Sequence, residues 1–203
     1  MRPFVVFAVV FVTGGVLMGF EMLGSRFLNP YFGSGIATWA GLISTVLYAL
    51  AIGYFAGGAI VDRYPQVTVV AACVAGAGLY LLGIPPFVDA VMQGLLTSLG
   101  YSAGAILIAS AILLAIPVAL LGMLSPAAVR LIIAEKQSAG RTSGAIYGVS
   151  AIGNVCGVLL TTFVLIPTIG SRAITYCFAA TLLVCAVLLL LMGRAGERRP
   201  LLP

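Results

Sequence analysis

The residues best able to do chemistry in this 203-residue chain are a few ionisable and amide side chains set inside long apolar segments. Glu21 and Arg26 lie near the end of the first such segment, and Asn154 lies well inside a later one. Placing a charge at the centre of a bilayer costs about 2.5–3.5 kcal/mol on insertion scales, so each charge needs a partner or a function. We therefore treat Glu21, Arg26 and Asn154 as candidate substrate-binding residues.

Glu21 is the candidate that would attract a cation. It lies eighteen residues beyond Pro3, which is about 27 Å along a helix, close to the bilayer boundary. Arg26 follows five residues later and lies about 140° further round the helix, so the two side chains do not face each other directly. The alternative is a structural ion pair or a solvated edge at the interface.

Polar and small side chains recur at spacings of three and four around Asn154, so they share one helical face. They are Tyr147, Ser150, Asn154, Gly157 and Thr161. Tyr48, with Thr45, lies at a similar depth in an earlier segment. The pattern predicts a polar cleft that includes Tyr48, Tyr147 and Asn154. The alternative for Asn154 is a hydrogen bond that only joins two helices.

The composition indicates a membrane protein. Hydrophobic residues make up 62% of the chain, charged residues make up 7%, and histidine is absent. Soluble domains carry about 25% charged residues, so this chain has too few to cover a surface in water. The net charge of +5 is not gathered on one polar face, which argues against nucleic acid as a partner and favours the lipid bilayer.

Neither a metal site nor a catalytic set is expected. The four cysteines all lie in apolar segments, and none forms a C-x-x-C pair. With no histidine, a zinc site is not expected. The sequence also lacks G-x-S-x-G and has no pair of carboxylates within one loop. We therefore expect no enzyme activity, no metal and no cofactor.

Charge-free segments predict an all-α fold of one domain over residues 1–203 with six transmembrane helices. The spans are residues 3–28, 36–61, 67–84, 103–124, 143–166 and 171–192. The first segment is longer than the 7–15 residues of a signal-peptide core and has no small-x-small site after it, so we expect it to be retained.

Prolines mark the ends of several predicted helices. Asn29-Pro30 should end the first, because the residue before proline avoids helical geometry. Pro85-Pro86 should end the third. Residues 87–99 then have the spacing of an amphipathic helix on the membrane surface. Ser125-Pro126 reads as an N-cap and first helical residue, beginning a short cytoplasmic helix over 126–137.

The basic residues predict orientation. With the N-terminus inside, eight lie on the cytoplasmic side and two on the other, a positive-inside bias. The eight are Arg2, Arg63, Arg130, Lys136, Arg141, Arg194, Arg198 and Arg199, and the two are Arg26 and Arg172. We expect a multi-pass protein of the bacterial inner membrane with both termini in the cytoplasm.

Glycines four residues apart predict close helix packing. We single out three such pairs: Gly53 and Gly57 in the second predicted helix, and Gly144 and Gly148 and Gly153 and Gly157 in the fifth. Packing within the chain is the first interpretation, and a dimer face is the alternative.

Gly58-x-x-x-Asp62-Arg63 resembles the loop between helices 2 and 3 of major facilitator transporters. In that family the aspartate caps a neighbouring helix and takes part in a charge latch that breaks during alternating access. The resemblance implies a gating corner at Gly58, Asp62 and Arg63. A simple helix-end cap is the alternative.

Two longer blocks resemble the membrane domain of bacterial fused major-facilitator/spermidine-synthase-like proteins. The first runs from Glu21 through Arg26 and Pro30 to Asp62-Arg63, and the second from Ser125-Pro126 to Gly170-Ser171-Arg172. In that family an aminopropyltransferase-like domain often follows. No segment here matches its active site, which implies a non-enzymatic role.

These features support a six-helix half of a facilitator that pairs with itself or with another membrane subunit. Its expected function is that of a small-molecule carrier, for polyamines or related organic cations. The alternatives are a membrane anchor for a separate aminopropyltransferase-like enzyme, docked on Arg130, Lys136 and Arg141, and a structural subunit of a larger membrane complex.

Overall fold

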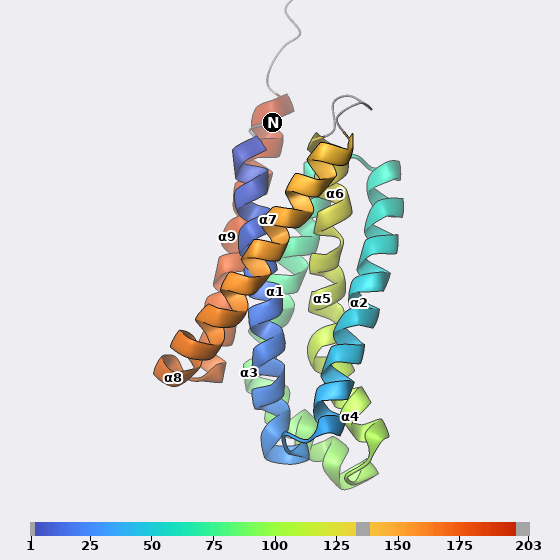
Figure 1. Cartoon of the computed structure of the whole chain (residues 1–203), viewed down its shortest axis with the longest axis vertical. Helices are drawn as coiled ribbons and strands as arrows, with labels where there is room; N and C mark the ends of the chain where they lie inside the picture. The colour runs from blue at the N-terminus through green and yellow to red at the C-terminus, as the bar shows by residue number, and fades with distance from the viewer. Residues whose placement is uncertain (1–2, 133–138, 198–203) are drawn as a thin grey trace, which may run out of the picture.

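The computed structural model describes residues 3–132 and 139–197. All regular elements in these two ranges are helical, and six helical segments are each long and apolar enough to cross a membrane. Figure 1 shows them running side by side along the long axis of the molecule. The predicted all-α class and the predicted number of helices able to span a membrane are therefore confirmed for the described residues.

Helix α1 (Pro3–Phe32) is longer than predicted. Asn29-Pro30 does not end the helix. Pro30 lies within its last turn, which continues to Phe32. The end comes at Gly33, which has φ +68° and whose N–H donates to the carbonyl of Asn29 at 2.9 Å. A glycine in this left-handed conformation is a common helix stop.

Helix α2 (Ile36–Arg63) closely follows its prediction. Helix α3 (Val67–Leu99) does not, because it continues through Pro85 and Pro86. The predicted break and the separate surface helix over 87–99 are wrong. Val88 and Met92 are buried in the bundle, so packing of the second half of α3 holds it in line despite the two prolines.

The fourth span consists of α4 (Ala103–Ser110), η1 (Ala111–Ala115), α5 (Ile116–Gly122) and α6 (Leu124–Ile132). Segment η1 is π-helical. The predicted N-cap at Ser125 is wrong, because α6 already begins at Leu124. The end of the predicted helix over 126–137 lies outside the described residues.

The fifth span consists of α7 (Ala139–Leu160), the π-helical η3 (Thr161–Leu165) and α8 (Ile166–Ile169), and α9 (Ser171–Glu197) is the sixth. Both π-helical segments directly precede an Ile-Pro pair, Ile116-Pro117 and Ile166-Pro167. A proline lacks an N–H and collides with the carbonyl one turn before it. We attribute the wider turns to relief of that collision.

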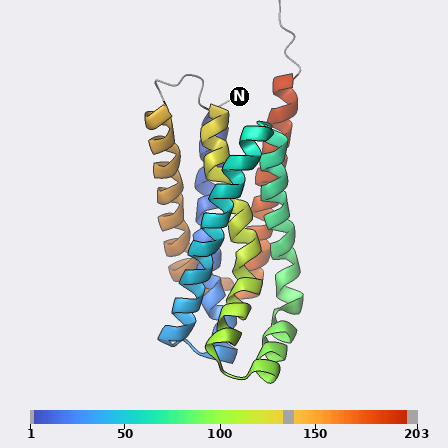
Figure 2. The same cartoon turned by 90° about the vertical axis from the view of Figure 1, so that its right-hand side faces the viewer.

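Helix α1 is the central element, and its Phe20, Leu23, Leu28 and Phe32 are almost completely buried. It packs along α7, while α3 packs along α9. Figure 2 shows α7 at one side of the bundle. Within α7 only Ile146, Gly153 and Gly157 are buried, so this helix rests on α1 by a narrow strip and leaves most of its surface uncovered.

Candidate functional site

A small polar pocket lies between α1, α2, α5, α6 and α7, and we call it the Asn154 pocket. Its polar lining consists of Thr13, Tyr54, Ser125, Ser150 and Asn154. The cavity volume is about 30 Å³, which is room for one or two water molecules and not for an organic substrate.

Asn154 joins α7 to α1. With its amide oriented so that the nitrogen faces two carbonyls, it donates to Gly14 O at 2.9 Å and to Ser150 O at 3.2 Å. This orientation is assigned from the hydrogen-bond network. A Cβ at Gly14 would lie 2.7 Å from one terminal amide atom of Asn154 and 2.8 Å from the backbone oxygen of Ser150, so a glycine is needed there for the two helices to meet.

Replacing Asn154 with alanine is expected to lower the free energy of unfolding by about 0.6 kcal/mol and at most about 1.7 kcal/mol, the range for interhelical hydrogen bonds in membranes. Denaturation in detergent micelles, followed by far-UV circular dichroism, measures this change. Cys156→Ala is the matched control on the same helix, because Cys156 is exposed and its truncation should have no effect. Equal stability of the two variants would contradict the assigned hydrogen bond.

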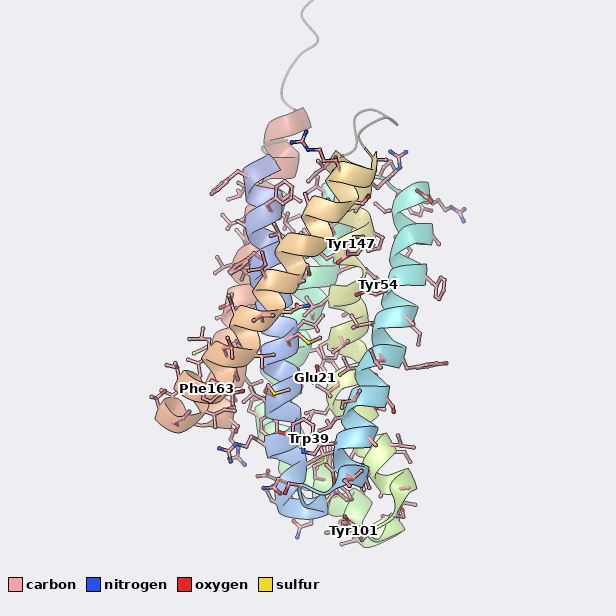
Figure 3. The ribbon with its side chains drawn as sticks, in the orientation of Figure 1. Glu21, Trp39, Tyr54, Tyr101, Tyr147 and Phe163 are labelled. Atoms are coloured by element: carbon pink, nitrogen blue, oxygen red, sulfur yellow. The ribbon has the colours of Figure 1, made fainter. Side chains whose placement is uncertain are left out.

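The predicted grouping of Tyr48 with Asn154 is not what the structure shows. Tyr48 is 73% exposed on the outside of the bundle, and the tyrosine of α2 that lines the pocket is Tyr54. Six residues separate them, which turns the two rings about 120° apart around the helix. Figure 3 shows Tyr54 between α2 and α7, on the same side of the molecule as Tyr147.

Glu21 lies deeper than the sequence predicted. Because α1 extends to Phe32, Glu21 is three to four residues, about 5 Å, from the midpoint of the helix. Its side chain is buried, with 9% of its surface exposed. Arg26 is exposed, and the described residues contain no ion pair between the two. Figure 3 shows Glu21 on the side of α1 that faces α5 and α2.

The predicted gating corner meets part of the predicted docking surface. Asp62 Oδ1 lies 3.6 Å from Arg130 Nε, so the ion pair joins α2 to α6. Beside it lies a groove of about 290 Å³ that Gly58, Asp62, Arg130, Ser143 and Tyr147 help to line. We call it the Asp62 groove. The pair lies at the same end of the bundle as the first turn of α1 (Figure 1).

The other predicted docking and gating residues are not part of this pair. The guanidinium carbon of Arg63 lies 5.7 Å from the centre of the Tyr64 ring, a cation–π contact. Arg141 is exposed, and Lys136 lies outside the described residues. The structure therefore brings together Gly58, Asp62, Arg130 and Tyr147 and leaves Arg63 and Arg141 apart from them.

Replacing Asp62 with asparagine is expected to change the free energy of unfolding by less than about 1 kcal/mol, because an exposed ion pair contributes little. The side chains of Arg130 and Asp62 are 54% and 75% exposed. Denaturation in detergent micelles at low and high salt measures this change in the free energy of unfolding. Thr68→Ala is the control, because Thr68 is also exposed and lies near the same end of the bundle. A loss of several kcal/mol would show that the pair holds the fold together.

Sequence reasoning missed a second ion pair, between Arg172 of α9 and Asp89 of α3. It also missed Thr13, Tyr54 and Ser125 as lining residues of the Asn154 pocket. Asp89 is the acidic residue within segment 87–99, and a charge in so apolar a segment indicates a need for a basic partner. The lining residues gave no signal, because hydroxyl groups occur throughout the apolar segments.

Comparisons with protein-family models, with curated proteins and with solved structures each found no match for this chain. The resemblance to the membrane domain of fused major-facilitator/spermidine-synthase-like proteins therefore stays a prediction. The class that the described residues define is that of an all-α protein with six helices able to span a membrane.

Proposed function

We propose that this chain is a six-helix half of a small-molecule membrane carrier, with polyamines or related organic cations as its substrates. The observation that carries the proposal is Glu21, a buried carboxylate near the middle of α1. A carboxylate at this depth is expensive unless it serves a function. An ammonium group is the ligand that its charge favours.

The position of Glu21 relative to the Asn154 pocket supports a transport path. Glu21 and Gly14, which contacts Asn154, are seven residues apart on α1, so they lie on nearly the same face about 10 Å apart. The Asp62 groove lies further along, at the end of the bundle. Three polar sites, namely Glu21, the Asn154 pocket and the Asp62 groove, thus lie along one side of the bundle from near its middle to one end.

A second six-helix unit is part of the proposal. The Asn154 pocket is too small for spermidine, whereas α2 and η3 leave large apolar side chains uncovered, including Phe55 and Phe163. A second copy, or another membrane subunit, would cover this side and enclose a larger cavity. The lipid bilayer covers the remaining surface.

Radiolabelled amine uptake into proteoliposomes tests the carrier. Spermidine, putrescine and a neutral solute of similar size are offered to vesicles with and without the protein. Uptake of the amines above that of empty vesicles supports the proposal. Uptake equal to that of empty vesicles for all amines would rule out the polyamine carrier.

The small size of the Asn154 pocket favours a second candidate, a membrane anchor for a separate aminopropyltransferase-like enzyme. Arg130 and Arg141, both exposed, would contact that enzyme if their end of the bundle faces the cytoplasm. The positive-inside bias favours this orientation. Labelling of single cysteines introduced at positions 64 and 101, in intact cells, tests it: label at position 101 alone supports a cytoplasmic N-terminus.

A further inference from the structure

Glu21 differs from the other described acidic side chains in having no partner. Asp62 pairs with Arg130, and Asp89 pairs with Arg172. Both pairs are more than half exposed to the surroundings of the bundle. Glu21 is nine-tenths buried, yet among the described residues it accepts no hydrogen bond and lies in no ion pair. The carboxyl group thus has no protein group to balance a negative charge.

The charged side chains that the structure describes on the neighbouring helices do not supply the missing partner. Six such side chains belong to helices packed in the bundle with α1: Asp62, Arg63, Asp89, Arg130, Arg141 and Arg172. Asp62 and Arg130 bind each other, as do Asp89 and Arg172, and Arg63 stacks on Tyr64. Arg141 is exposed near the start of α7, and Arg26 of α1 itself is exposed.

The titratable tyrosines and cysteines of these helices are also turned elsewhere. On α2, Tyr48 is exposed and Tyr54 lines the Asn154 pocket. On α7, Tyr147 lines the Asp62 groove and Cys156 is exposed.

On α3, Tyr80 donates to Ile112 O and Cys73 contacts Met123. On α9, Tyr176 and Cys177 are exposed, and Cys185 is buried in the apolar core.

An ionised Glu21 would therefore be a largely buried charge without a compensating group among the described residues. The cost of that state far exceeds the cost of burying a neutral polar group, which is about 1–3 kcal/mol in proteins. Such a group takes up a proton or binds a cation. The described residues around it supply neither a basic side chain nor a second carboxylate that would complete a metal site, since they contain no cluster of metal ligands.

We propose that Glu21 is a proton-binding site that exchanges its proton for the ammonium group of an organic cation. In the closed bundle the carboxyl group carries its proton and is neutral. When the cation arrives, the O–H bond of Glu21 breaks, the proton passes to water, and the carboxylate pairs with the ammonium group. For each ammonium group bound, one proton leaves, so the site stays neutral. The exchange rests on the proposed carrier function, whereas the proton site does not.

Infrared spectroscopy of the full chain in lipid vesicles tests the proton site without any substrate. At pH 7 the wild-type protein should show the carbonyl band of a protonated carboxylic acid, and Glu21→Gln should lose it. Asp62→Asn and Asp89→Asn should keep the band, because those carboxylates are paired with arginines. Glu21→Asp retains an acid and should shift the band, which keeps the test available if the glutamine variant does not fold. A wild-type spectrum without the band would overturn the proton site.

Proton movement during amine transport tests the exchange. Vesicles loaded with a pH-sensitive dye are given an inward spermidine gradient, and outward proton movement should follow in the wild type and be lost in Glu21→Gln. Amine uptake without proton movement would overturn the exchange and leave the carrier standing. An infrared band that depends on Glu21, together with no uptake of any amine, would support the proton site and refute the carrier.

Discussion

Gly157→Ala is expected to lower the free energy of unfolding by about 1–3 kcal/mol, the cost of overpacking a tight contact. A Cβ at Gly157 would fall on the backbone of Gly15, and one at Gly153 would fall on the backbone of Phe11. Both obstructions are backbone atoms, which cannot turn aside as a side chain can. Helix α7 would have to move away from α1, and the Asn154–Gly14 hydrogen bond would be lost with the contact.

Gly148→Ala is the matched control, because it lies on the same helix with nothing within 4 Å of its added Cβ. It should be neutral or stabilising by up to about 1 kcal/mol, since alanine favours a helix over glycine. Denaturation of both variants in the same detergent measures the difference. If the two substitutions had equal effects, α1 and α7 would not be in the close contact described here.

In the carrier proposed above, Glu21→Gln is expected to reduce spermidine uptake about 10- to 100-fold at concentrations well below saturation. A hydrogen bond to a charged group contributes about 1.5–3 kcal/mol, and each 1.4 kcal/mol is a tenfold change in affinity. Glutamine keeps the size and shape of glutamic acid but cannot carry a negative charge. The fold should survive, because the neutral amide resembles the protonated acid.

Asp89→Asn is the control for this substitution, since it removes one negative charge from the exposed pair with Arg172. Its initial uptake rate in proteoliposomes should stay close to that of the wild type, with protein incorporation checked by immunoblot. Equal uptake by wild type and Glu21→Gln would show that substrate does not contact Glu21. A comparable loss in Asp89→Asn would indicate a general effect of net charge.

The sequence alone determined the class of the fold. Six long apolar segments, separated by glycine, proline and charged residues, leave helices as the simplest solution, because backbone groups in lipid must satisfy one another within the segment. Proline was a poor guide to helix ends. Pro30, Pro85 and Pro86 all lie inside helices, since a proline can be tolerated where neighbouring helices hold the chain in line.

The sequence also identified candidate polar residues, but it did not determine where their side chains lie in the bundle. It identified Asn154 and offered two interpretations, and the hydrogen bond to Gly14 O is the helix-joining one. It put Tyr48 in the pocket where the structure has Tyr54, because depth along a helix follows from counting residues, whereas the facing direction of α2 depends on what it packs against.

Which glycine pairs form contacts depends on how the helices pack, and this is seen in the folded chain alone. Gly153 and Gly157 meet α1, and Gly53 and Gly57 meet Ala119 and Met123, while Gly144 and Gly148 meet nothing within the chain. The three motifs look alike in sequence because each only permits close approach. Glu21 is a similar case, because the sequence identified it as a carboxylate in an apolar segment but did not show its surroundings. Its burial and its lack of a partner are relations between helices, and these follow from packing rather than from local residue order.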